Sequence, residues 1–117
     1  MRVDLLRHGV TEATGYYHGR TDVPLAKTGE WQMRAATQRP RWSRVVSSPL
    51  RRCAVFAEHF AAECNLPFVL DERWREMDFG TWEGVCVADL DARQPEALGR
   101  FWRDPLRNPP PESEPLP

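Results

Sequence analysis

Residues 5–9 read LLRHG, and they end an apolar run that begins at Val3 and is interrupted once by an aspartate. The run predicts a first strand over residues 2–6. In open α/β sheets ligands bind just beyond the carboxyl ends of strands. We therefore predict that the arginine and histidine at this strand end, Arg7 and His8, take part in chemistry. A surface turn that contains both residues by chance is the alternative.

Apolar runs and turn signals alternate along the rest of the chain. A helix over 29–38, with Thr28 as its N-cap, follows a long loop at 7–27. The remaining elements are a strand at 44–48, a helix that begins at Pro49 behind Ser48, a strand at 67–70 and helical turns over 85–92 and 95–103. Strands that alternate with helices predict an α/β fold with a mostly parallel sheet covered by helices.

The helix after Pro49 has a predicted buried face. Its members share helical spacing: Val55, Phe56, His59, Phe60 and Cys64. We expect His59 to pack on that face rather than to take part in chemistry.

Composition limits the kinds of partner. The 117 residues allow one domain with a real core. Sixteen basic and 17 acidic residues give a net charge of −1, which argues against nucleic acid or an acidic membrane as the main partner. Three widely spaced cysteines form neither a disulfide framework nor a zinc site, so we expect a reduced, cytoplasmic setting. No apolar run approaches the length needed to cross a membrane.

The last residues have a different composition. In residues 105–117, PLRNPPPESEPLP, six of thirteen are proline. Such a segment cannot form a helix or a central strand. We predict a domain over 1–104 and an extended tail, or a connection to a further part, over 105–117.

A second strand ends as the first one does. The stretch VVSSPLRR at 45–52 places Ser48 at a helix N-terminus with Arg51 and Arg52 one turn further on. Helix N-termini favour anions. If the two strands are parallel neighbours, Arg7 and one of these arginines reach the same point, and two guanidinium groups suit a phosphate dianion.

Two further segments supply acid and polar groups. The stretch REMDFGTWEG at 75–84 contains Glu76, Asp78 and Glu83 among aromatic residues. A carboxyl group beside aromatic surface can stay protonated and act as a general acid. The stretch HGRTD at 18–22 adds His18 and an arginine. A basic phosphate pocket, a histidine and a nearby acid suit phosphoryl transfer through a covalent intermediate on histidine.

Four motifs together resemble the histidine phosphatase superfamily, which contains cofactor-dependent phosphoglycerate mutase and α-ribazole phosphatase. They are LLRHGVTEA, YYHGRTDVPLAKTGE, VVSSPLRR and RWREMDFGTWEG, in the order and at the spacing of that family. The resemblance implies a phosphoglycerate mutase-like three-layer sandwich. The REMDFGTWEG stretch and the later DP…PP stretch are most similar to the α-ribazole phosphatase branch, which is involved in cobalamin assembly.

The resemblance also implies roles for single residues. His8 matches the nucleophile that becomes phosphohistidine, and Glu76 matches the acid that protonates the leaving oxygen. Glu83 is the main competitor for the acid role and Asp78 a lesser one. The residues expected to bind phosphate or substrate are Arg7, Thr11, Gly19 and Arg52, with His18 either a substrate contact or a solvated loop residue. Arg51 is expected to be solvated.

The chain departs from the family pattern in three places. Val10 stands where the family usually has Glu or Gln, and Thr14 where it often has Asn. A late HG motif, whose histidine helps to hold the phosphoryl group, has no counterpart after Glu83. The chain therefore resembles an N-terminal portion of the family domain that lacks its C-terminal strands. Because an incomplete sheet exposes its edge and an apolar face, we predict poor solubility or a homodimer.

Three functions remain open from the sequence. The first is a phosphomonoesterase that acts through phosphohistidine on a small-molecule phosphate ester, α-ribazole phosphatase-like or of broad specificity. The second is a phosphoglycerate mutase-type phosphotransferase. The third is a truncated, non-catalytic phosphate-binding remnant. We expect no cofactor and no metal, because the arginines supply the positive charge.

Overall fold

The computed structural model describes residues 1–117, and the chain divides into two compact units. Unit 1 comprises Met1–Glu12 and Asp22–Arg75, and unit 2 comprises Ala13–Thr21 and Glu76–Pro117. Each unit is therefore built from two separate segments of the chain. The predicted division at residue 104 stays a prediction.

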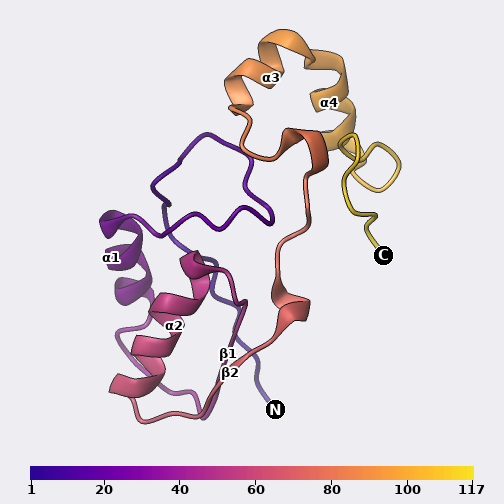
Figure 1. Ribbon diagram of the computed structural model, residues 1–117. Helices are drawn as coiled ribbons and strands as arrows, with labels where there is room; N and C mark the ends of the chain where they lie inside the picture. Colours follow the sequence, from indigo (N-terminus) through magenta and orange to yellow (C-terminus); the bar gives the residue numbers. More distant parts are fainter. The chain divides into compact units, whose positions relative to one another are not determined.

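Unit 1 is a small α/β layer. Strands β1 (Val45–Ser47) and β2 (Phe68–Leu70) pair in parallel, with Val46 opposite Val69. Helix α2 (Arg51–Glu63) is the crossover between them, and α1 (Lys27–Ala36) precedes β1 (Figure 1). The α/β class, the parallel pairing and both of these predicted strands are confirmed.

Helix α2 begins later than the sequence predicts. Its first helical residue is Arg51 rather than Pro49, and its N-cap is Leu50. Ser48 still serves the helix end, because its hydroxyl accepts a hydrogen bond from the Leu50 backbone N–H at 3.3 Å. The start moves because the backbone of Leu50 is extended, which no helical residue allows.

The buried face of α2 also differs from the predicted one. Arg52, Phe56 and Ala61 are buried, whereas Val55 and His59 are exposed. The prediction that His59 packs in the core is wrong. The later start of the helix leaves the helical spacing of these residues unchanged. The side of α2 that carries Phe56 faces the sheet and α1.

The predicted first strand is the largest error in unit 1. Residues 2–6 form no strand, and Leu5 remains 78% exposed. A segment becomes a strand only when a neighbour supplies ladder hydrogen bonds. Here β1 pairs only with β2, so residues 2–6 have no ladder partner. Side chains hold the segment instead: Asp4 accepts a hydrogen bond from Trp42 Nε1 at 2.7 Å and lies 3.9 Å from Arg41.

Helix α1 has a different cap from the one predicted. It begins at Lys27, two residues before the expected start, and Ala26 is its N-cap. Thr28 therefore lies inside the first turn and is not the cap. Met33 on the inner face of this helix is buried and belongs to the core of unit 1.

Unit 2 has a helical and aromatic core. The 3₁₀ turn η2 (Gly80–Trp82) is followed by α3 (Val87–Arg93) and α4 (Pro95–Arg103), close to the predicted helical turns. Trp82 is buried with Leu90 and Leu98. Aromatic rings pack around Trp82, with centroid distances of 5.6 Å to Tyr17 and 5.5 Å to Phe101. Edge-on and tilted rings at such distances stabilise each other beyond their buried area.

The C-terminal segment packs within unit 2. Pro110 is fully buried, and the carbonyl oxygen of Pro111 accepts a hydrogen bond from Thr81 N–H at 2.9 Å. Glu114 N–H donates to the carbonyl oxygen of Asp78 at 3.1 Å. The segment forms no helix or strand, as predicted from its prolines. None of the helices has the length and apolar character that crossing a membrane requires.

Candidate active site

The candidate residues are divided between the two units. Unit 1 contains Arg7, His8, Thr11 and Arg52, and unit 2 contains His18, Gly19 and Glu76. Within each unit the structure gives the contacts of these residues.

His8 is half-buried and its ring has a defined tautomer. Its Nδ1 lies 2.8 Å from the carbonyl oxygen of Gly9. A carbonyl oxygen can only accept, so Nδ1 must carry the hydrogen. The lone pair of a neutral imidazole then lies on Nε2. The geometry therefore presents Nε2 as a nucleophile.

The chain after His8 packs tightly against the start of α1. A Cβ atom on Gly9 would collide with the backbone of Gly29, and one on Gly29 would collide with Val10. Val10 N–H donates to Gln32 Oε1 at 2.9 Å, and Val10 accepts from Ala26 N–H at 2.9 Å. Gly29 was not among the residues predicted from the sequence; its signal is a glycine inside the first turn of a helix, where glycine costs stability.

The two adjacent arginines of α2 lie in different environments. Arg52, in the first turn of the helix, is only 2% exposed. Arg51 is exposed, as predicted, and its guanidinium donates to the carbonyl oxygen of Asp22 at 3.0 Å. Arg7 is exposed. Arg52 is therefore the arginine that the fold holds in place at a helix N-terminus, where backbone N–H groups favour anions.

Thr11 lies where the loop after His8 is tied back to the start of α1. It forms an isolated antiparallel bridge with Leu25 and is half-buried. The next residue donates from its backbone N–H to the carbonyl oxygen of Pro24 at 3.1 Å. Backbone contacts thus fix the chain between His8 and Thr11.

In unit 2, Gly19 sits where no side chain fits. It is buried, a Cβ there would collide with the carbonyl oxygen of Met77, and it would lie 2.5 Å from Glu83 Oε1. His18 beside it is half-buried, and its Nε2 lies 3.0 Å from the carbonyl oxygen of Ala13. The same argument as for His8 places the hydrogen of a neutral His18 on Nε2.

Glu76 and Glu83, the two carboxylates compared as acids, differ in hydrogen bonding. Glu76 is exposed, and its Oε1 accepts one bond, from Met77 N–H at 2.8 Å. Glu83 is half-buried and accepts bonds from Thr21 Oγ1 at 2.7 Å and from several backbone N–H groups. Burial alone raises the pKa of Glu83, but these hydrogen bonds outweigh it and lower that pKa below its ordinary value.

A carboxyl group that stays ionised is a poor proton donor. Glu83 therefore does not fit the role of general acid, for which the sequence made it the main competitor of Glu76. Asp78 accepts a hydrogen bond from Gly80 N–H at 2.9 Å, at the start of the turn η2. Glu76 likewise accepts one backbone hydrogen bond, and its role as the acid, with Asp78 as the lesser competitor, stays a prediction.

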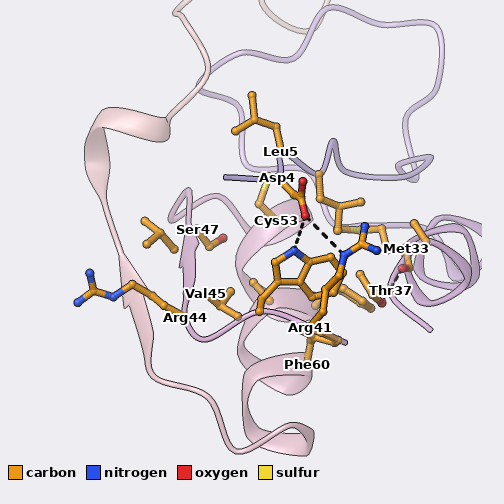
Figure 2. Close-up of a pocket in the computed structure, with 16 residues that line it drawn as sticks. Asp4, Leu5, Met33, Thr37, Arg41, Arg44, Val45, Ser47, Cys53 and Phe60 are labelled. Atoms are coloured by element: carbon orange, nitrogen blue, oxygen red, sulfur yellow. Dashed lines mark hydrogen bonds and ion pairs between the residues drawn. The ribbon is translucent and has the colours of Figure 1, made fainter. Parts of the chain in front are cut away.

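A cavity in unit 1 is separate from the candidate residues. It has a volume of about 400 Å³ and lies between residues 4–6, β1 and the inner faces of α1 and α2 (Figure 2). Apolar side chains such as Leu5, Met33 and Phe60 line it, and none of the candidate residues does. The unpaired N-terminal segment forms one wall of this cavity.

No group of three or more His, Cys, Asp and Glu side chains lies close enough together to hold a metal ion.

Comparison with known proteins places the chain in a family. The model of the histidine phosphatase superfamily (branch 1) matches residues 3–117, and the chain belongs to this superfamily. This confirms the resemblance drawn from the four motifs.

Known relatives are longer than this chain. A bifunctional protein of Mycobacterium tuberculosis is 38% identical over 115 residues, which cover 93% of this chain and 32% of that protein. The structure of mycobacterial glucosyl-3-phosphoglycerate phosphatase in complex with VO3 has a TM-score of 0.82 and 30% identity, and covers 92% of this chain and 55% of its own. The α-ribazole phosphatase of Shigella flexneri has a TM-score of 0.74 and 27% identity, over 93% of this chain and 56% of that chain. The chain thus spans about half of each of these two solved chains.

Proposed function

We propose that the chain is the part of a phosphomonoesterase that carries the nucleophile His8. The observation that supports this most directly is the contact of His8 Nδ1 with the Gly9 carbonyl oxygen at 2.8 Å, which presents the Nε2 lone pair. Membership of the histidine phosphatase superfamily supports the same assignment.

In the first step, His8 Nε2 attacks the phosphorus of a phosphomonoester dianion. The new N–P bond forms as the ester P–O bond breaks, and the leaving oxygen takes a proton from Glu76, which the family motif assigns as the acid. Arg7 and Arg52 hold the phosphoryl oxygens, and their charge stabilises the transition state.

In the second step, water replaces His8 on phosphorus. Glu76, now ionised, takes a proton from the attacking water, the N–P bond breaks, and inorganic phosphate leaves. His8 returns to its starting state with the hydrogen still on Nδ1. The chain's own residues thus account for each proton that moves.

The proposed substrate is a small phosphate monoester of the α-ribazole type or a broader set of such esters. The solved relatives named above support this choice, since one is an α-ribazole phosphatase and another is a glucosyl-3-phosphoglycerate phosphatase. Thr11, His18 and Gly19 are the remaining residues proposed to bind substrate.

The test compares His8→Ala with His59→Ala, a matched control on the exposed side of α2. Hydrolysis of p-nitrophenyl phosphate should fall at least ~1,000-fold in the His8 variant and stay unchanged in the control. Wild-type protein quenched in alkali should carry an acid-labile phosphate on His8.

Other outcomes contradict the proposal. Activity that survives in His8→Ala excludes His8 as the nucleophile. Isomerisation of phosphoglycerate that depends on a bisphosphate primer favours the mutase. Binding of vanadate without hydrolysis by wild-type protein favours a non-catalytic remnant.

A further inference from the structure

Glu83 anchors a loop of unit 2. Its carboxylate accepts hydrogen bonds from one hydroxyl and three backbone N–H groups, at 2.7 to 3.1 Å: Thr21 Oγ1, Gly19 N, Arg20 N and Phe79 N. Donors that converge on an ionised carboxylate form strong, directed bonds. The backbone of residues 19–21 is therefore wrapped around a fixed negative charge.

Arg20 extends this anchor to Glu76. Its backbone N–H donates to Glu83 Oε1 at 2.8 Å, and its Nε donates to the carbonyl oxygen of Glu76 at 3.0 Å. Its Nη2 donates to Glu114 Oε2 at 2.6 Å, and the same oxygen accepts from Asp78 N–H at 2.9 Å. Contacts of Arg20 therefore hold the main chain at Glu76 and, through Glu114, at Asp78.

We propose that Glu83 and Arg20 are positioning residues for Glu76. The Glu83 carboxylate fixes the backbone of Arg20, and the Arg20 guanidinium fixes the main chain of Glu76, so that the carboxyl group of Glu76 is presented in one place. The inference rests on the proposed function for the role of Glu76 as the acid. All of its contacts lie within unit 2.

The identity of the leaving group separates positioning from a general effect on the fold. Phenolate needs a proton as it leaves phosphorus, whereas p-nitrophenolate is stable enough to leave without one. Misplacing the general acid therefore slows phenyl phosphate hydrolysis much more than p-nitrophenyl phosphate hydrolysis. Loss of folded protein slows both equally.

The experiment measures kcat on both esters for Glu83→Gln, Arg20→Met and Glu76→Gln, with Glu96→Gln on the exposed start of α4 as the control. We expect Glu83→Gln and Arg20→Met to lower kcat roughly 10- to 100-fold on phenyl phosphate, and less than about threefold on p-nitrophenyl phosphate. The double variant Glu76→Gln/Glu83→Gln should lose no more than Glu76→Gln alone. Equal losses on both esters, or additive losses in the double variant, would overturn the proposal.

A second measurement does not depend on turnover. The Met77 amide donates to Glu76 Oε1 at 2.8 Å, so its NMR resonance reports the position of that carboxylate. In Glu83→Ala the amide resonances of Gly19, Arg20 and Met77 should all move, and formate should restore them by occupying the vacated anion position. A Met77 resonance that stays in place while the other two move would show that Glu83 does not position Glu76. If wild-type protein hydrolyses neither ester, the proposed function fails, and this spectrum still decides whether Glu83 holds the segment at Glu76.

Discussion

The two units differ in how completely they bury their apolar side chains. In unit 2, Trp82, Leu90 and Leu98 are each at most 6% exposed, and the chain itself supplies everything that covers them. In unit 1 the paired valines of the sheet, Val46 and Val69, are both 44% exposed. Helical turns can enclose a small core alone, whereas a parallel sheet needs cover on both faces.

The same contrast separates two kinds of candidate residue. His8 and Arg52 lie in the unit whose sheet has two strands and an unpaired N-terminal segment. Glu76 and Gly19 lie in unit 2, where the carboxylates of Glu83 and Glu114 accept hydrogen bonds that hold the loops in place. The units therefore differ in what fixes their candidate residues, and substitutions can test each of them separately.

The largest expected effect is on the core of unit 2. Trp82→Ala removes a side chain that is 2% exposed and packs against the rings of Tyr17 and Phe101. A buried aromatic residue replaced by alanine costs about 3–5 kcal/mol of unfolding free energy. Urea denaturation measures the loss, and hydrogen exchange locates it. Amides of α3 and α4 should lose more protection than those of α2; equal losses in both units would mean that unit 2 has no core of its own.

The next largest expected effect is a loss of kcat on replacing an arginine of unit 1. Arg52→Met keeps the aliphatic length of a buried side chain but removes its charge, whereas Arg51→Met does so at an exposed position. Losing one fixed donor to a developing phosphoryl charge costs about 10²- to 10³-fold in kcat. We expect that loss for Arg52 and less than about threefold for Arg51, measured on p-nitrophenyl phosphate. Equal losses would remove the distinction between the two arginines.

The sequence predicted local elements better than long-range pairings. The strand around Val45, the strand around Phe68 and the helical turns of unit 2 follow from periodicity and turn residues, which act over a few positions. The strand at 2–6 failed because a strand depends on a partner far away in the chain. The division of residues 13–21 from 22–75 also had no local signal.

The candidate site shows the same limit. The motif that contains His8 predicted the residue but not its tautomer, which depends on the backbone oxygen of Gly9. In the sequence, Glu83 competes with Glu76 for the acid role because both are glutamates of the same stretch. The four donors that keep it ionised come from positions 19–21 and 79, and only the folded chain brings them together.

Two substitutions on the sheet should change the stability of the fold little and the association of the chain clearly. We propose that copies of the chain associate through the exposed face of the sheet, where Val46 lies opposite Val69. The double variant Val46→Thr/Val69→Thr keeps β-branched side chains, so it should change the unfolding free energy by less than about 1 kcal/mol. Sedimentation velocity should show dimers or larger species for wild-type protein and a shift to monomer for the variant.

The control makes the same chemical change elsewhere. Val55→Thr lies on the exposed side of α2, at 49% exposure, and should leave the association state unchanged. A wild-type protein that sediments as a single monomer would remove this face as a self-association surface. An equal shift in the Val55 variant would point to general solubility instead.

The smallest effect is a pH dependence at the end of β2. Hydrogen bonds from the Arg73 side chain, reinforced by its backbone N–H, lower the pKa of Asp71 to about 2. A lowered pKa means that the ionised carboxylate stabilises the folded chain. This contribution is fully present above the ordinary aspartate pKa of 3.8 and is lost as the pH falls toward 2.

An NMR titration of the Asp71 carboxyl carbon checks this directly. Arg73→Met should return the Asp71 pKa toward its ordinary value, and the change should shrink in high salt, because the Arg73 side chain is 88% exposed and the pair is screened. Arg75→Met is the matched control, since Arg75 pairs with Glu72 at 3.2 Å rather than with Asp71. An Asp71 pKa that stays low in Arg73→Met would assign the shift to the backbone N–H at the start of the 3₁₀ turn Glu72–Trp74. The side-chain pair would then contribute nothing to the stability of unit 1.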